Sequence, residues 1–160
     1  MLKVKKLNPD AKCPTVGHPG EDLAYDLYSA EDTRILPWTT RRIGTGIAAV
    51  FDGPPLSTGQ GSFGWVVYSP ITKWGLLIQD RSSMANLSLF TIGSVLDSGY
   101  RGEIFVMIAN FTDEPVFLPA GSKIAQMVPT PVLTHCGMIE VAELPESSRG
   151  TGGFGSTGSR

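Results

Sequence analysis

Glycine and proline recur along the whole chain and divide it into short apolar runs. The 160 residues include 19 glycines and 12 prolines, which is too many for a helical bundle, because both residues interrupt helices. The runs between them are rich in β-branched and aromatic residues, as strands are. The sequence therefore predicts one all-β domain, a sandwich or a barrel, with enough chain to bury a core.

Charge and cysteine content limit the partners and the compartment. The net charge of −2 provides no basic field for nucleic acid. Cys13 and Cys136 lack a CxxC partner, so we expect reduced thiols, although a disulfide between them stays open. No apolar run reaches membrane-spanning length, and no signal-peptide core follows the basic residues 1–6. We therefore expect a cytoplasmic protein that binds neither nucleic acid nor membrane; a nuclear location stays open for a eukaryotic source.

Local patterns place the strands, one helix and a tail. The helix is expected at residues 82–88, with Asp80 and Ser82 available as N-caps. Two β-rich runs flank a turn at residues 97–100, which predicts a β-hairpin. The glycines within residues 41–51 suggest a bulge in that strand. Strands are expected at residues 2–7, 25–28, 32–38, 41–51, 65–68, 76–78, 87–96, 104–111, 116–118, 124–128 and 138–141.

Two stretches carry side chains suited to phosphate chemistry. In the hairpin turn, Asp97 lies three residues from Tyr100, so a base could stand beside a platform for a sugar or a nucleobase. An ordinary turn is the alternative, since aspartate is common in turns. Arg81, Ser82 and Ser83 open the expected helix, where free N–H groups and positive charge suit a phosphate. A simple capped helix with a surface arginine is the alternative there.

Three further features are weaker when taken alone. Gln126 follows a turn and is either a polar contact or a solvated edge residue. Asp26 could hold Mg²⁺ through water or serve as a turn residue. Residues 149–158 offer backbone amides, hydroxyls, an arginine and one aromatic ring, which suit a triphosphate and a base, or else form a disordered tail. Their glycines match a dinucleotide fingerprint, but no strand and helix frame them, so that fold is rejected.

In order along the chain, five stretches between residues 24 and 158 resemble the five motifs of the trimeric dUTP pyrophosphatases. The most specific are Asp-Ser-Gly-Tyr-Arg-Gly at residues 97–102 and the glycine-rich run at 149–158. Arg-Ser-Ser-Met-Ala at 81–85 and Ile-Ala-Gln at 124–126 support them, and the fifth stretch is Ala-Tyr-Asp-Leu-Tyr-Ser at 24–29. The resemblance implies an all-β, jelly-roll-like distorted β-barrel with one short helix at residues 1–145, a flexible nucleotide-closing arm at 146–160, and sites between three subunits.

The resemblance also implies a role for each matched residue. Asp97 would activate the water that attacks the α-phosphate, Tyr100 would stack under the deoxyribose, and Asp26 would hold the cofactor Mg²⁺ through water. The backbone around residues 91–102 would read uracil. The residues matched to nucleotide binding are Arg81, Ser82, Ser83, Thr91, Val95, Leu96, Tyr100, Gly102, Gln126, Arg149, Phe154, Gly155, Ser156 and Thr157.

The implied reaction is hydrolysis of dUTP to dUMP and pyrophosphate, which limits uracil in DNA and supplies dUMP for dTTP synthesis. The alternative is a dUTP-binding regulatory protein of the same fold that signals through ordering of the arm. A deaminase of the dCTP type would lack the Asp97 and Tyr100 pair in this form. Three stretches depart from the family pattern: Ser94 replaces a glycine, Asp80 replaces a frequent proline, and Ala24-Tyr25-Asp26 lacks the usual glycine before its variable residue. Residues 52–75 form a longer link between the first and second motifs than the family usually has, and they predict an extra hairpin arm that contacts a subunit or a protein partner.

Overall fold

The protein is described by a computed structural model that covers residues 1–53, 72–93, 95–133, 138–148 and 150. No helix in these ranges is long and apolar enough to cross a membrane. The elements are β1 (Leu2–Lys6), β2 (Tyr25–Tyr28), β3 (Thr33–Ile35), β4 (Thr40–Gly44), β5 (Ile47–Phe51), β6 (Thr72–Gln79), α1 (Ser82–Ala85), β7 (Leu89–Ile92), β8 (Val95–Leu96), β9 (Phe105–Asn110), β10 (Val116–Leu118) and β11 (Lys123–Leu133).

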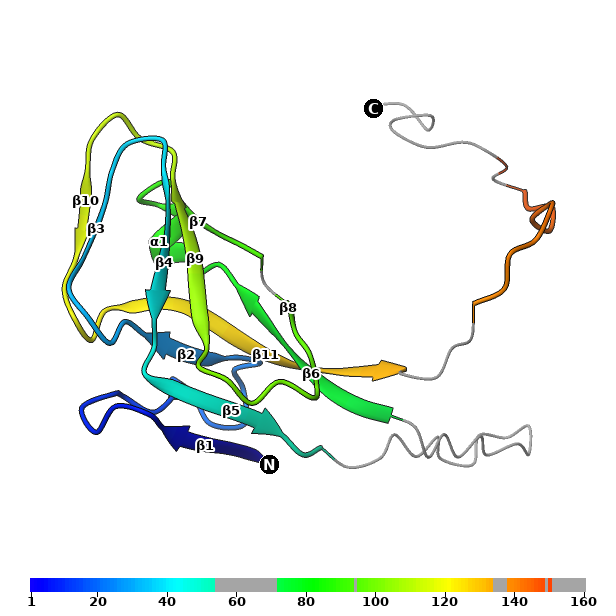
Figure 1. Ribbon diagram of the computed structural model, residues 1–160, viewed down its shortest axis with the longest axis horizontal. Helices are drawn as coiled ribbons and strands as arrows, with labels where there is room; N and C mark the ends of the chain where they lie inside the picture. The colour runs from blue at the N-terminus through cyan, green and yellow to red at the C-terminus, as the bar shows by residue number, and fades with distance from the viewer. Residues whose placement is uncertain (54–71, 94, 134–137, 149, 151–160) are drawn as a thin grey trace.

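The strands pair antiparallel in four small sheets, with the orders β1-β5, β10-β3, β2-β11-β6-β8 and β4-β9-β7 (Figure 1). The described strands do not close into one continuous barrel, and the all-β, jelly-roll-like distorted fold with one short helix is confirmed. Every sheet contributes apolar side chains to one core. Its fully buried members include Leu27, Ile35, Ile43, Ile47, Leu89, Ile104, Ile108, Ile124 and Met127.

Strand β11 is longer than the sequence pattern suggested, because it continues through two prolines. It pairs with β2 from Lys123 to Met127 and with β6 from Gln126 to Leu133. Pro129 and Pro131 follow at alternate positions and pair only with β6. A proline is tolerated where its missing N–H would point away from the ladder. The prolines therefore lie where β11 has become an edge strand.

The expected single strand at residues 41–51 is wrong, because the chain breaks between β4 and β5. Gly46 has a φ of +67°, a backbone conformation that favours glycine. The break is held by the buried Thr45, whose hydroxyl donates to the Ile104 carbonyl at 2.7 Å, and by Glu103, which accepts from the Gly46 N–H at 2.8 Å. The two halves therefore join different sheets.

The predicted hairpin is correct only in its first part. β7 pairs with β9, from Leu89 opposite Asn110 to Ile92 opposite Met107. After Gly93, which has a φ of +65°, the chain leaves this sheet and β8 pairs with β6 instead. The turn at residues 97–100 therefore connects two sheets, because the glycine lets the strand change direction.

Three smaller expectations also need correction. The helix ends at Ala85, and its N-cap is Arg81 without a side-chain cap, so neither Asp80 nor Ser82 caps it. Residues 138–141 form no strand, and Met138 is 95% exposed. The end of the expected arm at 52–75 is regular structure, because β6 begins at Thr72. The strand expected at 65–68 lies outside the described residues.

Candidate active site

Strand register brings together three of the five motif stretches. Gln126 in β11 lies opposite Asp26 in β2 on one side and opposite Gln79 in β6 on the other. Directly opposed residues in a sheet are close neighbours, about 5 Å apart. Asp80 and Arg81 follow immediately after β6, so the polar residues of these stretches meet at one end of the four-stranded sheet.

The Asp26 carboxylate lies between two cations. Its Oδ1 accepts from Arg81 Nε at 2.7 Å, and its Oδ2 accepts from Lys123 Nζ, also at 2.7 Å. The side chains of Asp26 and Arg81 are only 14% and 24% exposed, so this pairing is poorly screened by water. The three groups together carry one net positive charge, which favours an anionic ligand.

A cavity of about 750 Å³ opens over this cluster. Ser82 also lines it, and the loop before β2 forms its other wall, with Glu21 and Asp22 on an exposed rim. The backbone N–H of His18 donates to Asp22 Oδ2 at 2.8 Å, which lowers the pKa of that carboxyl. The volume falls in the range of ligand-binding sites, about 300–1,000 Å³.

Lys123 is a member of the site that sequence reasoning missed. It opens β11 three residues before Gln126, a spacing that puts two side chains on opposite faces of a regular strand. The register of β11 against β2 shifts between Lys123 and Ala125, and no sequence pattern signals this irregularity. The hydrogen bond it donates to Asp26 raises the pKa of the Lys123 ammonium above its usual value of 10.5. Lys123 therefore stays charged at neutral pH, beside Arg81.

This pairing predicts a pH dependence of stability. A lysine whose pKa is higher in the folded state than in the unfolded state stabilises fully below the unfolded value and loses that contribution as the pH rises through the folded value. We expect Lys123→Gln to be less stable than the parent at pH 8, with the difference shrinking as the pH rises past the usual pKa of 10.5 and vanishing above the higher pKa of the folded state. Urea denaturation at pH 8 and at a pH above the raised pKa of Lys123 measures the two stabilities. A difference that persists at the higher pH would contradict the stabilising ion pair between Lys123 and Asp26.

Asp97 and Tyr100 lie in a rigid turn. The Tyr100 N–H donates to the Asp97 carbonyl at 3.0 Å, and its hydroxyl donates to the Glu103 carbonyl at 2.8 Å. Arg101 adds bonds to the carbonyls of Ser98 and Tyr100 at 2.9 and 2.8 Å. No described group hydrogen-bonds the exposed carboxylate of Asp97, so it is available to a ligand or a water.

The position of the Tyr100 ring depends on Gly102. A Cβ at residue 102 would lie 2.5 Å from Tyr100 Oη, closer than real contacts allow. We therefore expect Gly102→Ala to displace the ring and to weaken the binding of a ligand that packs on it about tenfold, the effect of losing a contact of roughly 1.4 kcal/mol. Gly99→Ala is the matched control, because nothing lies within 4 Å of its added Cβ. Equal ligand affinities of the two variants, measured by calorimetry, would contradict this role of Gly102.

Within one chain, Asp97 is separated from the cavity. Leu96 pairs with Leu76, and β8 runs antiparallel to β6, so Asp97 lies beyond Leu76 on the side away from Gln79. At ~3.3 Å per residue, Asp97 and Gln79 are about 10 Å or more apart. Asp97 and Tyr100 border a different cavity of only about 10 Å³. One chain therefore brings Asp26, Arg81, Ser82 and Gln126 together, but not Asp97. Ser83 adjoins this group through a bond from Arg81 at 3.1 Å.

The uracil-reading residues expected on β7 and β8 lie on different sheets. Val95 and Leu96 pair with β6. Thr91 in β7 donates both its N–H and its hydroxyl to Asp80. The expected tail residues Arg149, Phe154, Gly155, Ser156 and Thr157 lie outside the described residues.

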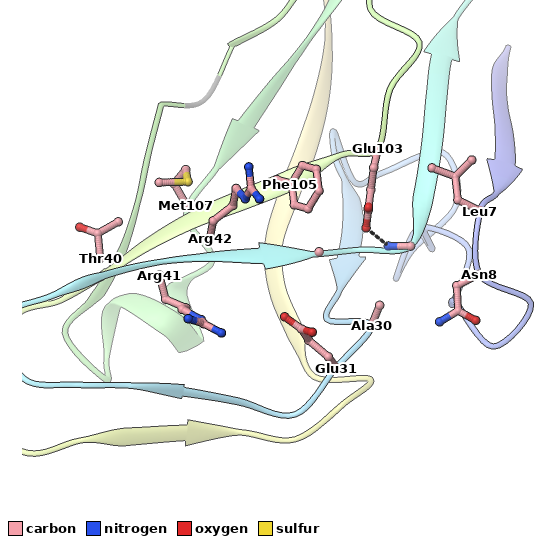
Figure 2. Close-up of a pocket in the computed structure, with 12 residues that line it drawn as sticks. Leu7, Asn8, Ala30, Glu31, Thr40, Arg41, Arg42, Glu103, Phe105 and Met107 are labelled. Carbon is pink, nitrogen blue, oxygen red and sulfur yellow. Dashed lines mark hydrogen bonds between the residues drawn. The ribbon is translucent and has the colours of Figure 1, made fainter.

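A second cavity of about 740 Å³ lies over β4 and β9 (Figure 2). Its basic side chains Arg41 and Arg42 come from β4, and the Arg42 guanidinium lies 4.5 Å from the centre of the Phe105 ring. Glu103 is already bonded to Gly46. None of the motif residues lines this cavity, so it is the weaker candidate.

The chain is similar to known proteins of one family. The dUTPase family profile matches residues 65–158. The deoxyuridine 5'-triphosphate nucleotidohydrolase of Clostridium kluyveri is 36% identical over 160 residues, 98% of this chain and 97% of the relative. The same enzyme of a Picosynechococcus species is also 36% identical, over 98% of both chains.

Solved structures share the fold. A mutant dUTPase of Staphylococcus bacteriophage 80alpha with dUpNHpp has a TM-score of 0.78 at 24% identity, covering 99% of this chain and 98% of that one. A mutant dUTPase of S. aureus phage phi11, whose structure concerns a structural Mg(II) ion, has a TM-score of 0.70 at 21% identity, covering 89% and 97%. The matched profile spans more than half of the chain and the relatives match nearly all of it, and so the chain belongs to the dUTPase family.

Proposed function

We propose that this protein hydrolyses dUTP to dUMP and pyrophosphate. The observation that carries the proposal is the cluster of the half-buried Asp26 and Arg81 with the exposed Lys123 at the cavity, with Gln126 beside it. Its two cations are N–H donors that suit a triphosphate, because charge-assisted hydrogen bonds are the strong ones. Membership of the dUTPase family indicates that this triphosphate is dUTP.

Asp97 is the proposed general base. It takes a proton from the water that attacks the α-phosphate, while Arg81 and Lys123 stabilise the charge on the phosphate oxygens. Phosphoryl-type transfer needs an oriented water and charge neutralisation more than a covalent nucleophile. Tyr100, fixed over Gly102, offers its ring as a platform for the sugar. The proton taken by Asp97 is then released to solvent, since the carboxylate is exposed.

Asp26 fits a magnesium ion only in part. No group of three or more His, Cys, Asp or Glu side chains within the described ranges could hold a metal by itself. Mg²⁺ is commonly held by one or two carboxylates together with substrate phosphates and water. The charge of Asp26 is already neutralised by two cations. Asp26 would therefore contact, through water, a magnesium ion that is bound to the triphosphate. That ion would neutralise charge on the phosphates.

The separation of Asp97 from the cavity supports a homotrimer with sites between subunits. A complete site requires Asp97 and Tyr100 from one chain and the Asp26 cluster from another. The C-terminal arm, residues 146–160, is proposed to close over the nucleotide, and the insertion at 52–75 to contact a subunit or a protein partner. The regulatory alternative gains no support from the described contacts.

One sheet face offers a contact surface for this assembly. In the β4-β9-β7 sheet, Val106 and Ile108 are buried in the core, whereas Phe105 and Met107 point to the opposite, outer side. The neighbouring β7 side chains on that outer side are Phe90, 38% exposed, and Ile92, 44% exposed. Exposed apolar patches often mark protein contacts. We define Phe90, Ile92, Phe105 and Met107 as the outer face.

We expect Phe90→Glu to convert the assembly to monomers, because a charge buried in an apolar contact costs about 2 kcal/mol or more for each chain. Analytical ultracentrifugation measures the state. Phe117→Glu is the matched control, since Phe117 is 60% exposed on β10, away from the outer face. A trimer that survives Phe90→Glu, or dissociates equally in both variants, would show that this face is not the contact.

Pyrophosphate release tests the proposed reaction. The parent is incubated with Mg²⁺ and, in parallel, with dUTP, dCTP, dTTP or UTP. Selective cleavage of dUTP is expected. Equal cleavage of all four nucleotides, or binding of dUTP without release of pyrophosphate, would overturn the proposal. Its cellular consequence would be a lower dUTP level for DNA synthesis and a supply of dUMP for dTTP.

A further inference from the structure

Asp80 makes a group of hydrogen bonds that the proposed reaction does not use. Its Oδ1 accepts from the Thr91 N–H at 2.5 Å and from the Thr91 hydroxyl at 2.6 Å. Its backbone carbonyl accepts from Gln126 Nε2 at 2.6 Å. The residue is half-buried. An aspartate at this point thus connects the end of β6 to β7 and to β11.

These bonds enclose the site residues. Asp80 and Thr91 are eleven positions apart, and the segment between them holds Arg81 and helix α1. The hydrogen bonds between Asp80 and Thr91 join the two ends of this segment, and they therefore restrict the positions that the Arg81 side chain can take. The Gln126 bond adds a third element, since β11 also carries Lys123 at the same cavity. A four-residue helix without a side-chain cap could not hold this segment in place by itself.

We propose that Asp80 is a positioning residue: its carboxylate closes the segment that carries Arg81, and its carbonyl holds Gln126 in register with Arg81. The catalytic consequence rests on the proposed function. Asp80 itself lines neither cavity and acts through its neighbours. Because hydrogen bonds to an ionised acceptor are stronger than neutral ones, losing the carboxylate releases the segment.

The test compares Asp80→Ala, Asp80→Asn and the parent. Asp80→Ala is expected to weaken the binding of inorganic tripolyphosphate, measured by calorimetry, about tenfold and to lower kcat/KM for dUTP by at least as much, the loss typical of a hydrogen bond to a charged group. Asp80→Asn keeps an acceptor oxygen without the charge and should recover part of both. Hydrogen exchange of the Thr91 amide should be fastest in Asp80→Ala and intermediate between that variant and the parent in Asp80→Asn.

Two further variants separate positioning from a general effect on folding. Asp32→Ala removes another carboxylate that accepts a backbone N–H, from Ala120 at 2.7 Å, outside the cavity. It should lower the urea midpoint comparably without changing tripolyphosphate affinity. Thr91→Val should weaken tripolyphosphate binding less than Asp80→Ala, and the double variant should be no worse than Asp80→Ala.

The proposal is overturned by unchanged tripolyphosphate affinity in Asp80→Ala, by equal losses in Asp32→Ala, or by additive losses in the double variant. Neither tripolyphosphate binding nor amide exchange requires turnover. A parent protein that releases no pyrophosphate would therefore refute the proposed function, while these two measurements would still decide the role of Asp80.

Discussion

Asp97→Asn is expected to lower kcat for dUTP by about 10³-fold while changing dUTP affinity less than about threefold, since a general base contributes roughly 10²–10⁴ to the rate. Asparagine has nearly the same shape but cannot take the proton from the attacking water. Because no described group hydrogen-bonds the Asp97 carboxylate, the change breaks no internal contact. Pyrophosphate release gives kcat, and calorimetry with dUTP gives the affinity.

Ser98→Ala is the control for this prediction. It alters the next side chain in the same turn, and the Ser98 carbonyl still accepts from Arg101. Its kcat should stay close to that of the parent. If Asp97→Asn keeps more than a tenth of the parent kcat, Asp97 is not the base. If dUTP affinity falls as steeply as kcat, the residue acts in binding.

Arg81→Ala is expected to lower kcat/KM for dUTP about 100-fold or more, because losing one partner of a half-buried charged contact costs roughly 2–5 kcal/mol. The change removes a cation from the cluster at the cavity and leaves Asp26 paired with Lys123 alone. The cluster becomes neutral and attracts a triphosphate less. Arg34→Ala is the control, since Arg34 is an exposed arginine on β3, remote from the cavity. Losses of equal size would contradict a specific role for Arg81.

The same two variants test whether subunits share a site. If Asp97 and Arg81 of one site come from different chains, co-expression of Asp97→Asn with Arg81→Ala restores about one quarter of the sites by random mixing in a closed oligomer. Co-expression of the doubly substituted chain with the parent provides the control. Mixed oligomers that show no recovered activity would place the whole site within one chain.

Some of the site could be predicted from residues alone. Asp26, Arg81 and Gln126 stood out because each belongs to a short motif, and the structure brings them together at one cavity. Lys123 did not, because a lysine after a turn is normally solvated; only its position in β11, opposite Tyr28, places it near Asp26. Periodicity indicates which residues form strands, whereas register decides which side chains meet.

The amino-acid sequence by itself determined the all-β class, the motif residues and the family, because composition and local patterns act over short distances. Tertiary structure decided what depends on distant partners. Gly93 sends β8 to β6 instead of β9, and this move separates Asp97 from Arg81 within one chain. Asp80, a departure from the family pattern, follows β6 and finds its partner in Thr91 of β7, a strand of a different sheet. Such pairings depend on the free energy of the whole fold, so no local window of sequence contains them.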